Sequence, residues 1–411
     1  MASDPVAGAA AVSEEAAIGF VLTLGRALHR FGTPADRLEE ALNVVCRRLG
    51  LAVELFSTPT TLIASFGRPT ELRTRMMRMG PGDLNMAKLT QVDAVADAAS
   101  TGLMSMGEAT ARLDAIVAAP ATWSRPVATF ADGLTAAAVA VFFHGGWRDV
   151  LVSGLVGLAV GILGQLMARS KSRSRVFELV GAAVAAFASG AAAALWPGVS
   201  ASVCTVAGII VLLPGLTLTV AMTELATRNL ISGTARLMSA VIVLFELVVG
   251  VAVGERCAQR LFEPPHVLPV PMPSWTEWVA LVAAAFAMTI VVQAERRALA
   301  WILAASVVGV VGARLGAQLL GPELGALGGA FALGLAVNLY ARILDRPAQV
   351  VLVPAMILLV PGSVGFRGMS SLLDRDTLTG VETTFAMFVV AIAIVAGLLV
   401  ANATVSPRRH L

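Results

Sequence analysis

The pattern of hydrophobic and polar positions changes near residue 122. Before this point charged residues interrupt the apolar stretches, whereas beyond it ten apolar runs are separated by short charged connections. A helix needs about 20 apolar residues to cross the hydrocarbon core of a bilayer. The runs cover residues 126–143, 149–168, 177–195, 199–222, 230–254, 276–293, 297–316, 323–342, 350–367 and 382–402. The pattern therefore predicts an α-helical polytopic membrane protein with about ten transmembrane helices behind a soluble domain.

Residues 1–122 are expected to form a small cytoplasmic α+β domain. Apolar positions at helical spacing predict a helix over 14–30, and a second helix follows that Thr33 can cap and Asp36 can stabilise from its first turn. His29, near the end of the first helix, is interpreted as a helix-surface residue. The start of the chain lacks the basic segment and apolar core of a cleavable signal peptide, so this domain is expected to remain in the cytoplasm.

Strand-forming residues in the middle of this domain predict a small sheet. The runs 51–56 and 61–66 are rich in such residues and are separated by a turn sequence, which favours a hairpin. A third strand is predicted over 74–79. Two helical segments, at about 85–100 and 107–118, then lead towards the first apolar run.

Basic residues between the apolar runs predict the side of the membrane on which each connection lies. Arginine and lysine gather after the second, sixth and eighth runs, and such clusters mark cytoplasmic connections. They are Arg169, Lys171, Arg173, Arg175, Arg296, Arg297, Arg342 and Arg346. Because Arg408 and Arg409 follow the last run, both chain ends are expected in the cytoplasm and the proline-rich segment 263–273 outside it.

The chain contains an internal repeat. When the sequence is shifted so that Val203 lies over Val350, 203–233 aligns with 350–380 without a gap, and ten of the 31 positions are identical. A Pro-Gly pair, an arginine and a glycine shared at one offset are hard to attribute to apolar composition alone. We therefore interpret 123–254 and 276–411 as duplicated membrane repeats of five helices each, joined by an extracytoplasmic loop over 255–275.

An odd number of spans in each repeat has a consequence for mechanism. The second repeat must begin on the opposite side of the membrane from the first, which gives two inverted five-helix repeats. Two equivalent elements that face opposite solutions supply a scaffold that can open to each side in turn. Carriers need this exchange and passive channels do not, so the repeat favours alternating access over a channel.

A Pro-Gly pair interrupts the fourth apolar run, and a second pair interrupts the ninth. Proline removes a backbone donor and glycine permits unusual dihedral angles, so each pair predicts a broken helix, with a simple proline kink as the alternative. A broken helix exposes N–H groups at one half and C=O groups at the other, which suit the carboxylate and ammonium of an amino acid. The predicted substrate-binding residues lie in or beside the breaks and are Pro214, Gly215, Thr217, Thr219, Glu224, Pro361, Gly362 and Ser363.

Ionisable residues within spans are costly and often mark solute pathways or proton relays. Asp132 and Glu246 are therefore predicted to couple transport to protons, with a hydrated carboxylate near the helix end as the alternative for Asp132. In a second interpretation of Glu224, it pairs with Arg228 and holds a loop at the membrane surface. Residues predicted to act in gating or structure are Arg228, Asn229, Ser232, Gly233, Arg236, Arg375 and Asp376.

Composition and motifs narrow the function further. Hydrophobic residues make up 57% of the 411 residues and charged residues only 14%, which is more apolar surface than a soluble protein of this length can bury. The three cysteines include no C-x-x-C pair, and the sequence has no nucleophile elbow, zinc-protease motif or phosphate-binding loop. We therefore predict no catalytic residue, cofactor or metal. The net charge of +3 comes almost wholly from arginine and is not interpreted as a nucleic-acid surface.

Several motifs resemble those of the bacterial threonine/serine exporters. In the N-terminal part the likeness lies in 31–34 and 60–66, and in the membrane part it lies in 145–149, 214–236 and 360–363. The likeness covers nearly the whole chain, and its strongest element is the run from Pro214 to Arg236. The two five-span halves are similar to the two membrane modules of that family, fused here in one polypeptide.

This resemblance implies proton-driven export of L-threonine and L-serine across the bacterial inner membrane. The expected partners are the small amino-acid substrate, protons and the lipid bilayer, with a homo-oligomer as a further option and no nucleic acid. Two other functions stay open. One is export of another small organic acid such as a dicarboxylate, for which Arg228, Arg236 and Arg375 could supply positive charge, and the other is a membrane-tethered enzyme.

Overall fold

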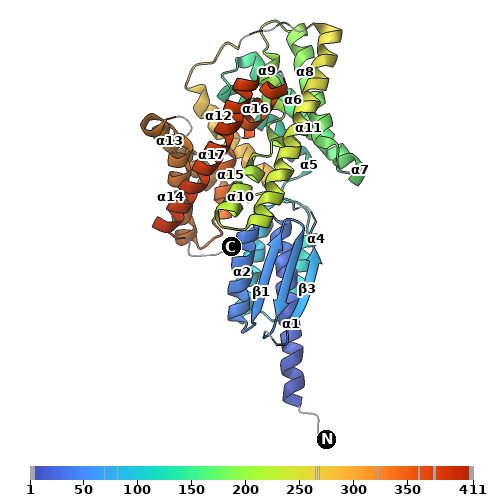
Figure 1. Cartoon of the computed structure of the whole chain (residues 1–411), viewed down its shortest axis with the longest axis vertical. Helices are drawn as coiled ribbons and strands as arrows, with labels where there is room; N and C mark the ends of the chain where they lie inside the picture. The colour runs from blue at the N-terminus through green and yellow to red at the C-terminus, as the bar shows by residue number, and fades with distance from the viewer. Residues whose placement is uncertain are drawn as a thin grey trace.

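The computed structural model describes residues 5–406 except 69, 81, 264, 266, 268, 322, 323, 360, 361, 374 and 375. Two of the predicted site residues, Pro361 and Arg375, therefore lie outside the described residues. An N-terminal domain, made of α1–α4 and a three-stranded sheet, is stacked against a helical bundle, made of α5–α17 (Figure 1).

The N-terminal domain packs its helices against one face of the sheet. Its helices are α1 (Pro5–Arg30), α2 (Ala35–Arg48), α3 (Met86–Ser100) and α4 (Met106–Ala118). Its strands are β1 (Val53–Thr58), β2 (Thr61–Phe66) and β3 (Arg73–Arg78), which pair antiparallel in the order β1-β2-β3. Alternate residues of β2, namely Leu62, Ala64 and Phe66, are at most 2% exposed and pack into the core beneath α1. The predicted hairpin and third strand are thus confirmed.

Two expectations for this domain are wrong. His29 is only 9% exposed, and its Nε2 lies 3.2 Å from the carbonyl oxygen of Gly80, so the ring belongs to the interior of the domain. Thr33 does not cap α2, because its hydroxyl has no hydrogen-bond partner among the described residues. The N–H of Ala35 instead donates to Glu224 of the bundle.

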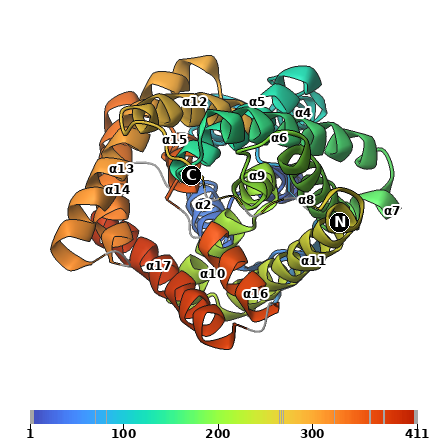
Figure 2. The same ribbon diagram turned by 90° about the horizontal axis from the view of Figure 1, so that it is seen from above.

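The bundle is a ring of long helices with shorter helices inside it (Figure 2). Its first half consists of α5 (Arg125–Phe142), α6 (Trp147–Met167), α7 (Lys171–Ser174), α8 (Phe177–Leu195), α9 (Ala201–Gly208), η1 (Ile210–Leu212), α10 (Gly215–Ala226) and α11 (Leu230–Phe262). Its second half consists of α12 (Thr276–Val291), η2 (Arg296–Ala298), α13 (Leu299–Leu320), α14 (Gly325–Leu344), α15 (Gln349–Ile357), α16 (Gly362–Leu373) and α17 (Thr377–Thr404). Seen from above, α9, α10 and α15 lie inside the ring.

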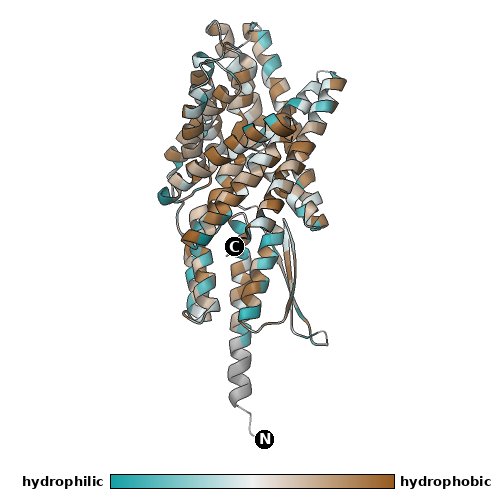
Figure 3. Cartoon of the chain, turned by 90° about the vertical axis from the view of Figure 1, so that its left-hand side faces the viewer, coloured by the Kyte–Doolittle hydropathy of each residue, from teal (hydrophilic) through white to brown (hydrophobic). Residues whose placement is uncertain are grey.

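Six helices in the described part of the chain are long and apolar enough to cross a membrane, and the bent pair of α9 with α10 brings this number to seven. The six are α6, α8, α11, α13 with its preceding turn, α14 and α17. Of the other three predicted spans, 126–143 forms α5, which has 18 residues but is not among these six, 276–293 forms the shorter α12, and 350–367 is divided between α15 and α16. Ten full-length spans are therefore not confirmed. Apolar residues dominate the bundle (Figure 3), and large side chains such as Leu155, Phe245 and Phe385 are more than half exposed. Apolar surface on this scale marks an interaction site, which for a ring of such helices is the lipid.

The helix boundaries reproduce the offset found in the sequence. α10 begins at Gly215 and α16 at Gly362, and the interval between these two starts is the one that separates the aligned repeats. The starts of α11 and α17 are separated by the same interval. The packing pairs correspond as well, because α8 on α11 has its counterpart in α14 on α17, and α10 on α11 in α16 on α17.

Glycines permit the first of these helix contacts in both halves. A Cβ on Gly250 would lie 2.3 Å from the carbonyl oxygen of Leu179. Gly397 lies at the position of the second half that aligns with Gly250, and a Cβ there would lie 2.5 Å from the carbonyl oxygen of Leu327. Any larger residue at either position would force the two helices apart.

Backbone hydrogen bonds join the two parts of the chain. The N–H of Met86 donates to the carbonyl of Val292 at 3.0 Å, and the N–H of Ala87 donates to that of Gln293 at 3.1 Å. The start of α3 therefore satisfies carbonyls at the end of α12, where an aligned pair of helix dipoles is favourable. Trp123, in the linker, donates from its N–H to the side chain of Gln293 at 2.9 Å. These bonds fix the N-terminal domain against the bundle.

The ends of the long helices define two faces of the bundle. α17 ends beside the N-terminal domain, because Asn402 shares a cavity with Asp36 of α2. The 28 residues of α17 span about 42 Å, so its first residue and the preceding α16 lie towards the far face. α11 runs the other way, since Arg236 near its start contacts Glu224 at the domain junction and its 33 residues reach about 50 Å beyond.

Candidate functional site

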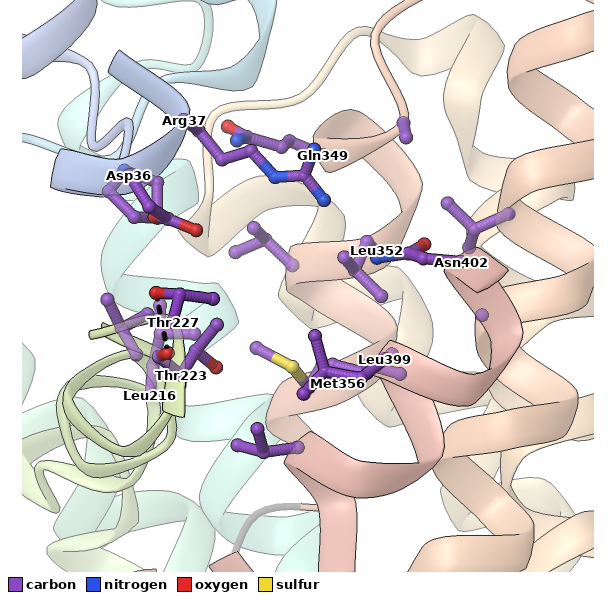
Figure 4. Close-up of a pocket in the computed structure, with 18 of the residues that line it drawn as sticks. Asp36, Arg37, Leu216, Thr223, Thr227, Gln349, Leu352, Met356, Leu399 and Asn402 are labelled. Carbon is purple, nitrogen blue, oxygen red and sulfur yellow. Dashed lines mark hydrogen bonds between the residues drawn. The ribbon is translucent and has the colours of Figure 1, made fainter. Parts of the chain in front are cut away.

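A cavity of about 460 Å³ lies where the N-terminal domain meets the bundle (Figure 4). The start of α2 forms its roof, α10 forms one wall, and α14, α15 and α17 form the opposite walls. Pockets of this size commonly hold small molecules. Both halves of the bundle and the N-terminal domain contribute, so none of these parts forms the cavity alone.

One face of α10 lines this cavity. The lining residues of this helix are Leu216, Val220, Thr223 and Thr227. Their spacing of three and four residues places them on one side of the helix. The predicted Thr217 and Thr219 lie off this face. Thr219 is fully buried, and its hydroxyl donates to the carbonyl of Gly215 at 3.2 Å.

Leu216 lines the cavity, whereas its neighbour Gly215 and the glycine that Gly215 contacts, Gly362, lie behind this lining. The fourth apolar run is broken as predicted, since α9 ends at Gly208, the short η1 follows and α10 starts only at Gly215. The segments Ala201–Gly208 and Ile210–Ala226 are bent by 42°. A Cβ on Gly362 would lie 3.2 Å from the Cα of Gly215 and 3.3 Å from its nitrogen. The first residues of α10 and α16 therefore meet backbone to backbone. Helix N-termini carry unpaired N–H groups and partial positive charge, so two of them at one place suit a carboxylate.

The roof of the cavity is charged. Its residues from α2 are Asp36, Arg37, Glu39 and Glu40. Arg37 and Glu40 form an ion pair at 3.3 Å, and Glu39 accepts the N–H of Ser57 at 2.6 Å. The buried Oδ1 of Asp36 has no hydrogen-bond partner within the described part of the chain. Three carboxylates against one guanidinium suit a solute that carries an ammonium group.

Burial sets the proton affinity of these roof carboxyls. It raises the pKa of Asp36 above its usual value, an effect that Arg37 opposes and the nearby charge of Glu224 increases. Burial also raises the pKa of Glu39, although the hydrogen bond from Ser57 lowers it. Both carboxyls therefore take up a proton at a higher pH than exposed ones do.

Glu224 joins the roof to the wall. Its side chain is fully buried, and Oε1 accepts the N–H of Ala35 at 3.0 Å. Oε2 accepts the hydroxyl of Ser232 at 2.9 Å, and Nε of Arg236 lies 3.0 Å from both oxygens. The carboxylate thus pairs with Arg236 and not with Arg228, which is exposed and has a φ of 67°. The hydrogen bonds that it accepts come from the protein, and its role in substrate binding stays a prediction.

The other predicted gating residues lie around the ends of α10 and α16. Asn229 lines the cavity, and its Nδ2 donates to the hydroxyl of Thr227 at 3.3 Å. A Cβ on Gly233 would lie 2.7 Å from Leu225, so the turn from α10 into α11 is tight. Ser363, which was predicted to bind substrate, lies in the first turn of α16, and this role stays a prediction. Asp376 caps α17 by accepting the N–H of Thr379 at 3.3 Å.

The two predicted proton-coupling residues lie apart from this cavity. Asp132 lines a separate cavity of about 430 Å³ with Gly161 and Gln165. Glu246 lines a groove beside α11 with Arg175. Glu178, at the start of α8, lines both hollows and so lies between the two acids. The roles of Asp132 and Glu246 in proton coupling stay predictions.

Reasoning from the sequence missed several residues of the cavity. Asp36 was considered only for its place in α2, and Gln349 and Asn402 are isolated amides in apolar helices. The helical period could have identified the α10 face, since Thr223 and Thr227 share a side with Leu216. No comparable signal marks the residues from α2, α15 and α17. Among the described residues, no group of three or more His, Cys, Asp or Glu side chains is placed to hold a metal ion.

Two family models match the chain. Residues 19–257 match the family described as "Putative threonine/serine exporter", and residues 277–404 match "Threonine/Serine exporter, ThrE".

The chain is similar to several fungal membrane proteins and to an uncharacterized fungal protein. Pheromone-regulated membrane protein 10 of Pichia sorbitophila is 28% identical over 382 residues, which cover 86% of this chain and 37% of that protein. The protein of the same name in Eremothecium gossypii is 27% identical over 384 residues, with 90% and 51% covered. Uncharacterized protein C7D4.12c of Schizosaccharomyces pombe is 26% identical over 365 residues, with 85% and 48% covered. The chain thus spans 37% to 51% of the length of these relatives. No solved structure matches it.

Proposed function

Because this chain belongs to the threonine/serine exporter family, we propose that it is a secondary active exporter of small hydroxy amino acids, L-threonine and L-serine, driven by proton motive force. The observation that carries the proposal is the meeting of two half-helix N-termini, at Gly215 and Gly362, behind the lining of a cavity that is roofed by acids. One end of this cavity suits a carboxylate and the other suits an ammonium group.

The two ends act in sequence and not together. From Gly215 to Thr227, α10 rises about 18 Å, whereas the carboxylate and ammonium of an amino acid are joined to one carbon. Asp36 therefore attracts the ammonium group at the entrance, and the solute then moves along the hydroxyls of Thr227 and Thr223. At the floor its carboxylate reaches the N–H groups of the broken helices.

Exchange between the two sides rests on inverted halves. The helix starts that recur at the offset of the repeat support the duplication, and the opposite directions of α11 and α17 support the inversion. The crossing of Gly215 and Gly362 is the point about which the halves can tilt. The driving force is adequate, because one charge moving through 100 mV releases about 2.3 kcal/mol, enough for a roughly 50-fold solute gradient.

We place the bundle in the inner membrane of a bacterial cell, with the N-terminal domain and both chain ends in the cytoplasm. The basic connection after α12 supports this orientation, because Arg296 lies over the ring of Trp123 beside the N-terminal domain, 5.0 Å from its centroid. The second candidate is export of a dicarboxylate, which the guanidinium of Arg37 in the roof favours. The acids beside Arg37 oppose it, since a dianion would meet their charge.

The proposed function is tested by uptake of labelled threonine into proteoliposomes. We expect saturable uptake that increases when a pH gradient is imposed, and competition by serine but not by succinate. In Glu246→Gln the gradient should lose its effect, because a side chain that cannot bind a proton cannot couple proton flow to transport. Equal gradient dependence in both proteins would remove Glu246 from the proton pathway, and flux that ignores the gradient in the wild type would contradict proton coupling itself.

Asp36→Asn should raise the KM for threonine at the cytoplasmic face about tenfold, because the variant loses a charge-assisted contact with the ammonium group. Asp114→Asn, at an exposed aspartate on α4, is the matched control and should leave KM unchanged. The ionised form of Asp36 binds the cation, so wild-type affinity is full above the pKa of this group and falls as the pH drops through it. Because burial raises that pKa, the fall should begin at a higher pH than for an exposed aspartate, and Asp36→Asn should abolish it. Parallel pH profiles in both proteins would exclude this role.

Cys257 offers a test of orientation in the native sequence. Cys46 and Cys204 are buried, whereas Cys257 is exposed near the end of α11 that lies away from the N-terminal domain. Burial also raises the pKa of Cys46 to about 12, which keeps its thiol protonated and unreactive. A membrane-impermeant maleimide should therefore label intact cells, and Cys257→Ser should lose the label. Labelling only after the cells are broken would place this end of α11 in the cytoplasm.

A further inference from the structure

A second cavity lies at the far face of the bundle, away from the N-terminal domain. It has a volume of about 300 Å³ and is formed by α8, the start of α9 and the end of α11, with Pro265 and Val267 of the segment after α11 completing the lining. Its polar lining residues are Ser200, Ser202, Thr205, Glu255 and Gln259. Thr205 and Ser200 are at most 2% exposed, so part of this polar lining is held inside the protein.

The positions that line this cavity repeat those that line the cavity beneath the N-terminal domain. At the offset of the repeat, Ala201, Ser202 and Thr205 of α9 correspond to Ala348, Gln349 and Leu352 of α15. Glu255 of α11 corresponds to Asn402 of α17. All of these residues line one or the other cavity. The offset comes from residues 203–233, so most of these positions lie outside the segment that defined it.

The helices α8 and α14 extend the correspondence. Ala186 and Gly190 of α8 line the far cavity, and Gly334 and Asn338 of α14 line the cavity beneath the N-terminal domain. The separation between the two residues of each pair, Ala186 with Gly334 and Gly190 with Asn338, is one residue longer than the offset of the repeat. The contact atoms agree with this small difference, since a Cβ on Gly250 would meet Ala182 and a Cβ on Gly397 would meet Ala330. Three helices of each half therefore build the same hollow twice.

We propose that the far cavity is the release site for the transported solute, the second of two equivalent sites on opposite faces of the membrane. This inference rests on the proposed function. The ligand is a small hydroxy amino acid, whose ammonium group is held by the carboxylate of Glu255 and whose hydroxyl is met by Thr205 and Ser202.

The acids of the two cavities come from different sources. Beneath the N-terminal domain the acids at the entrance, Asp36 among them, come from α2, and the position of α17 that corresponds to Glu255 carries the neutral Asn402. At the far face no part of the N-terminal domain is present, and the acid is Glu255 of α11 itself. Both cavities therefore offer a carboxylate to the ammonium group of the solute. The duplicated helices supply this carboxylate only at the far cavity, and the N-terminal domain supplies it at the other.

The difference in volume indicates which side is open. α10 lines the larger cavity along four residues, whereas no residue of α16 with a described side chain lines the smaller one. α16 is the counterpart of α10, so the far cavity lacks the wall that would complete it. In the opposite conformation α16 takes that place and the far cavity grows, while α10 withdraws from the other.

The test measures KM separately from each face, using the full chain in right-side-out and inside-out vesicles and labelled threonine as the probe. Glu255→Gln should raise KM at the far face about tenfold and leave KM at the face of the N-terminal domain unchanged, because the charge-assisted contact exists only at the far face. Asp36→Asn should show the reverse. Glu263→Gln, an exposed glutamate at the same end of α11 but outside the cavity lining, is the matched control.

The outcomes separate this inference from the proposed function. If the wild type carries no threonine in either direction, the proposed function fails. If it does carry threonine and Glu255→Gln behaves like Glu263→Gln, or shifts KM equally at both faces, the release site is wrong and the exporter stands. Thr205→Val and Thr205→Ser form a second pair for the case in which Glu255→Gln does not fold. Loss of far-face affinity in the valine variant only would support the site, and loss in both or in neither would overturn it.

Discussion

Glu224→Ala should lower the midpoint of thermal unfolding of the full chain by several degrees and abolish threonine transport. The carboxylate is fully buried and holds the N–H of Ala35, the hydroxyl of Ser232 and the guanidinium of Arg236. Removing one partner of a buried charged pair typically costs about 3 kcal/mol or more, because the other charge loses its compensation. The hydrogen bond from the N–H of Ala35, which joins the roof of the cavity to α10, would also be lost.

Glu54→Ala is the control for this prediction, since Glu54 is an exposed glutamate of β1. We expect the Glu54→Ala variant to have the same midpoint of thermal unfolding as the wild type. Glu224→Ala combined with Arg236→Ala should recover part of the lost stability, because the double variant no longer buries an unpaired charge. A midpoint for Glu224→Ala that matches that of Glu54→Ala would show that the junction does not depend on this carboxylate.

Gly362→Ala should reduce threonine transport about 5- to 150-fold, because overpacking of about 1–3 kcal/mol at the crossing shifts the balance between the two orientations of the carrier. The added Cβ would lie 3.2 Å from the Cα of Gly215, closer than side chains normally approach a backbone that cannot move aside. The measurement is initial efflux from preloaded proteoliposomes, with the midpoint of thermal unfolding recorded on the same samples.

Gly154→Ala provides the matched control within a membrane helix. A Cβ at this position would lie 3.5 Å from the Cβ of Ala137, which is ordinary contact, so transport should not change. If Gly362→Ala transports as well as Gly154→Ala, the crossing of the broken helices tolerates an extra methyl group. It would then not be the point about which the halves move.

Local patterns were sufficient to predict most elements. The hairpin between 51–56 and 61–66 followed from strand formers around a turn, and the observed strands lie within two residues of it. The break at Pro214-Gly215 followed from the chemistry of those two residues alone. Each of these features depends on residues that are close together in the sequence. It can therefore be predicted from the sequence without knowledge of the tertiary structure.

Partners that are distant in the sequence could not be predicted in this way. Thr33 was expected to cap α2, but the N–H of Ala35 is satisfied by Glu224, which is 189 residues away. His29 was predicted to lie on the surface, because nothing in the sequence of its own helix indicates that the carbonyl of Gly80 lies beside the ring. In both cases a group from another element occupies the site, and no periodicity or motif near the first group records it.

The sequence by itself determined that apolar helices dominate the chain, and it predicted two related halves that each contain a Pro-Gly pair. These properties follow from the composition, from the spacing of apolar residues and from the comparison of the sequence with itself. None of them requires knowledge of which distant residues are in contact. Only the tertiary structure decided that Gly215 meets Gly362, that Asp36 roofs one cavity with Asn402 in its wall, and that Glu255 lines another. The physical reason is that a cavity forms among side chains from several packed elements, so its lining depends on their packing and not on any one segment.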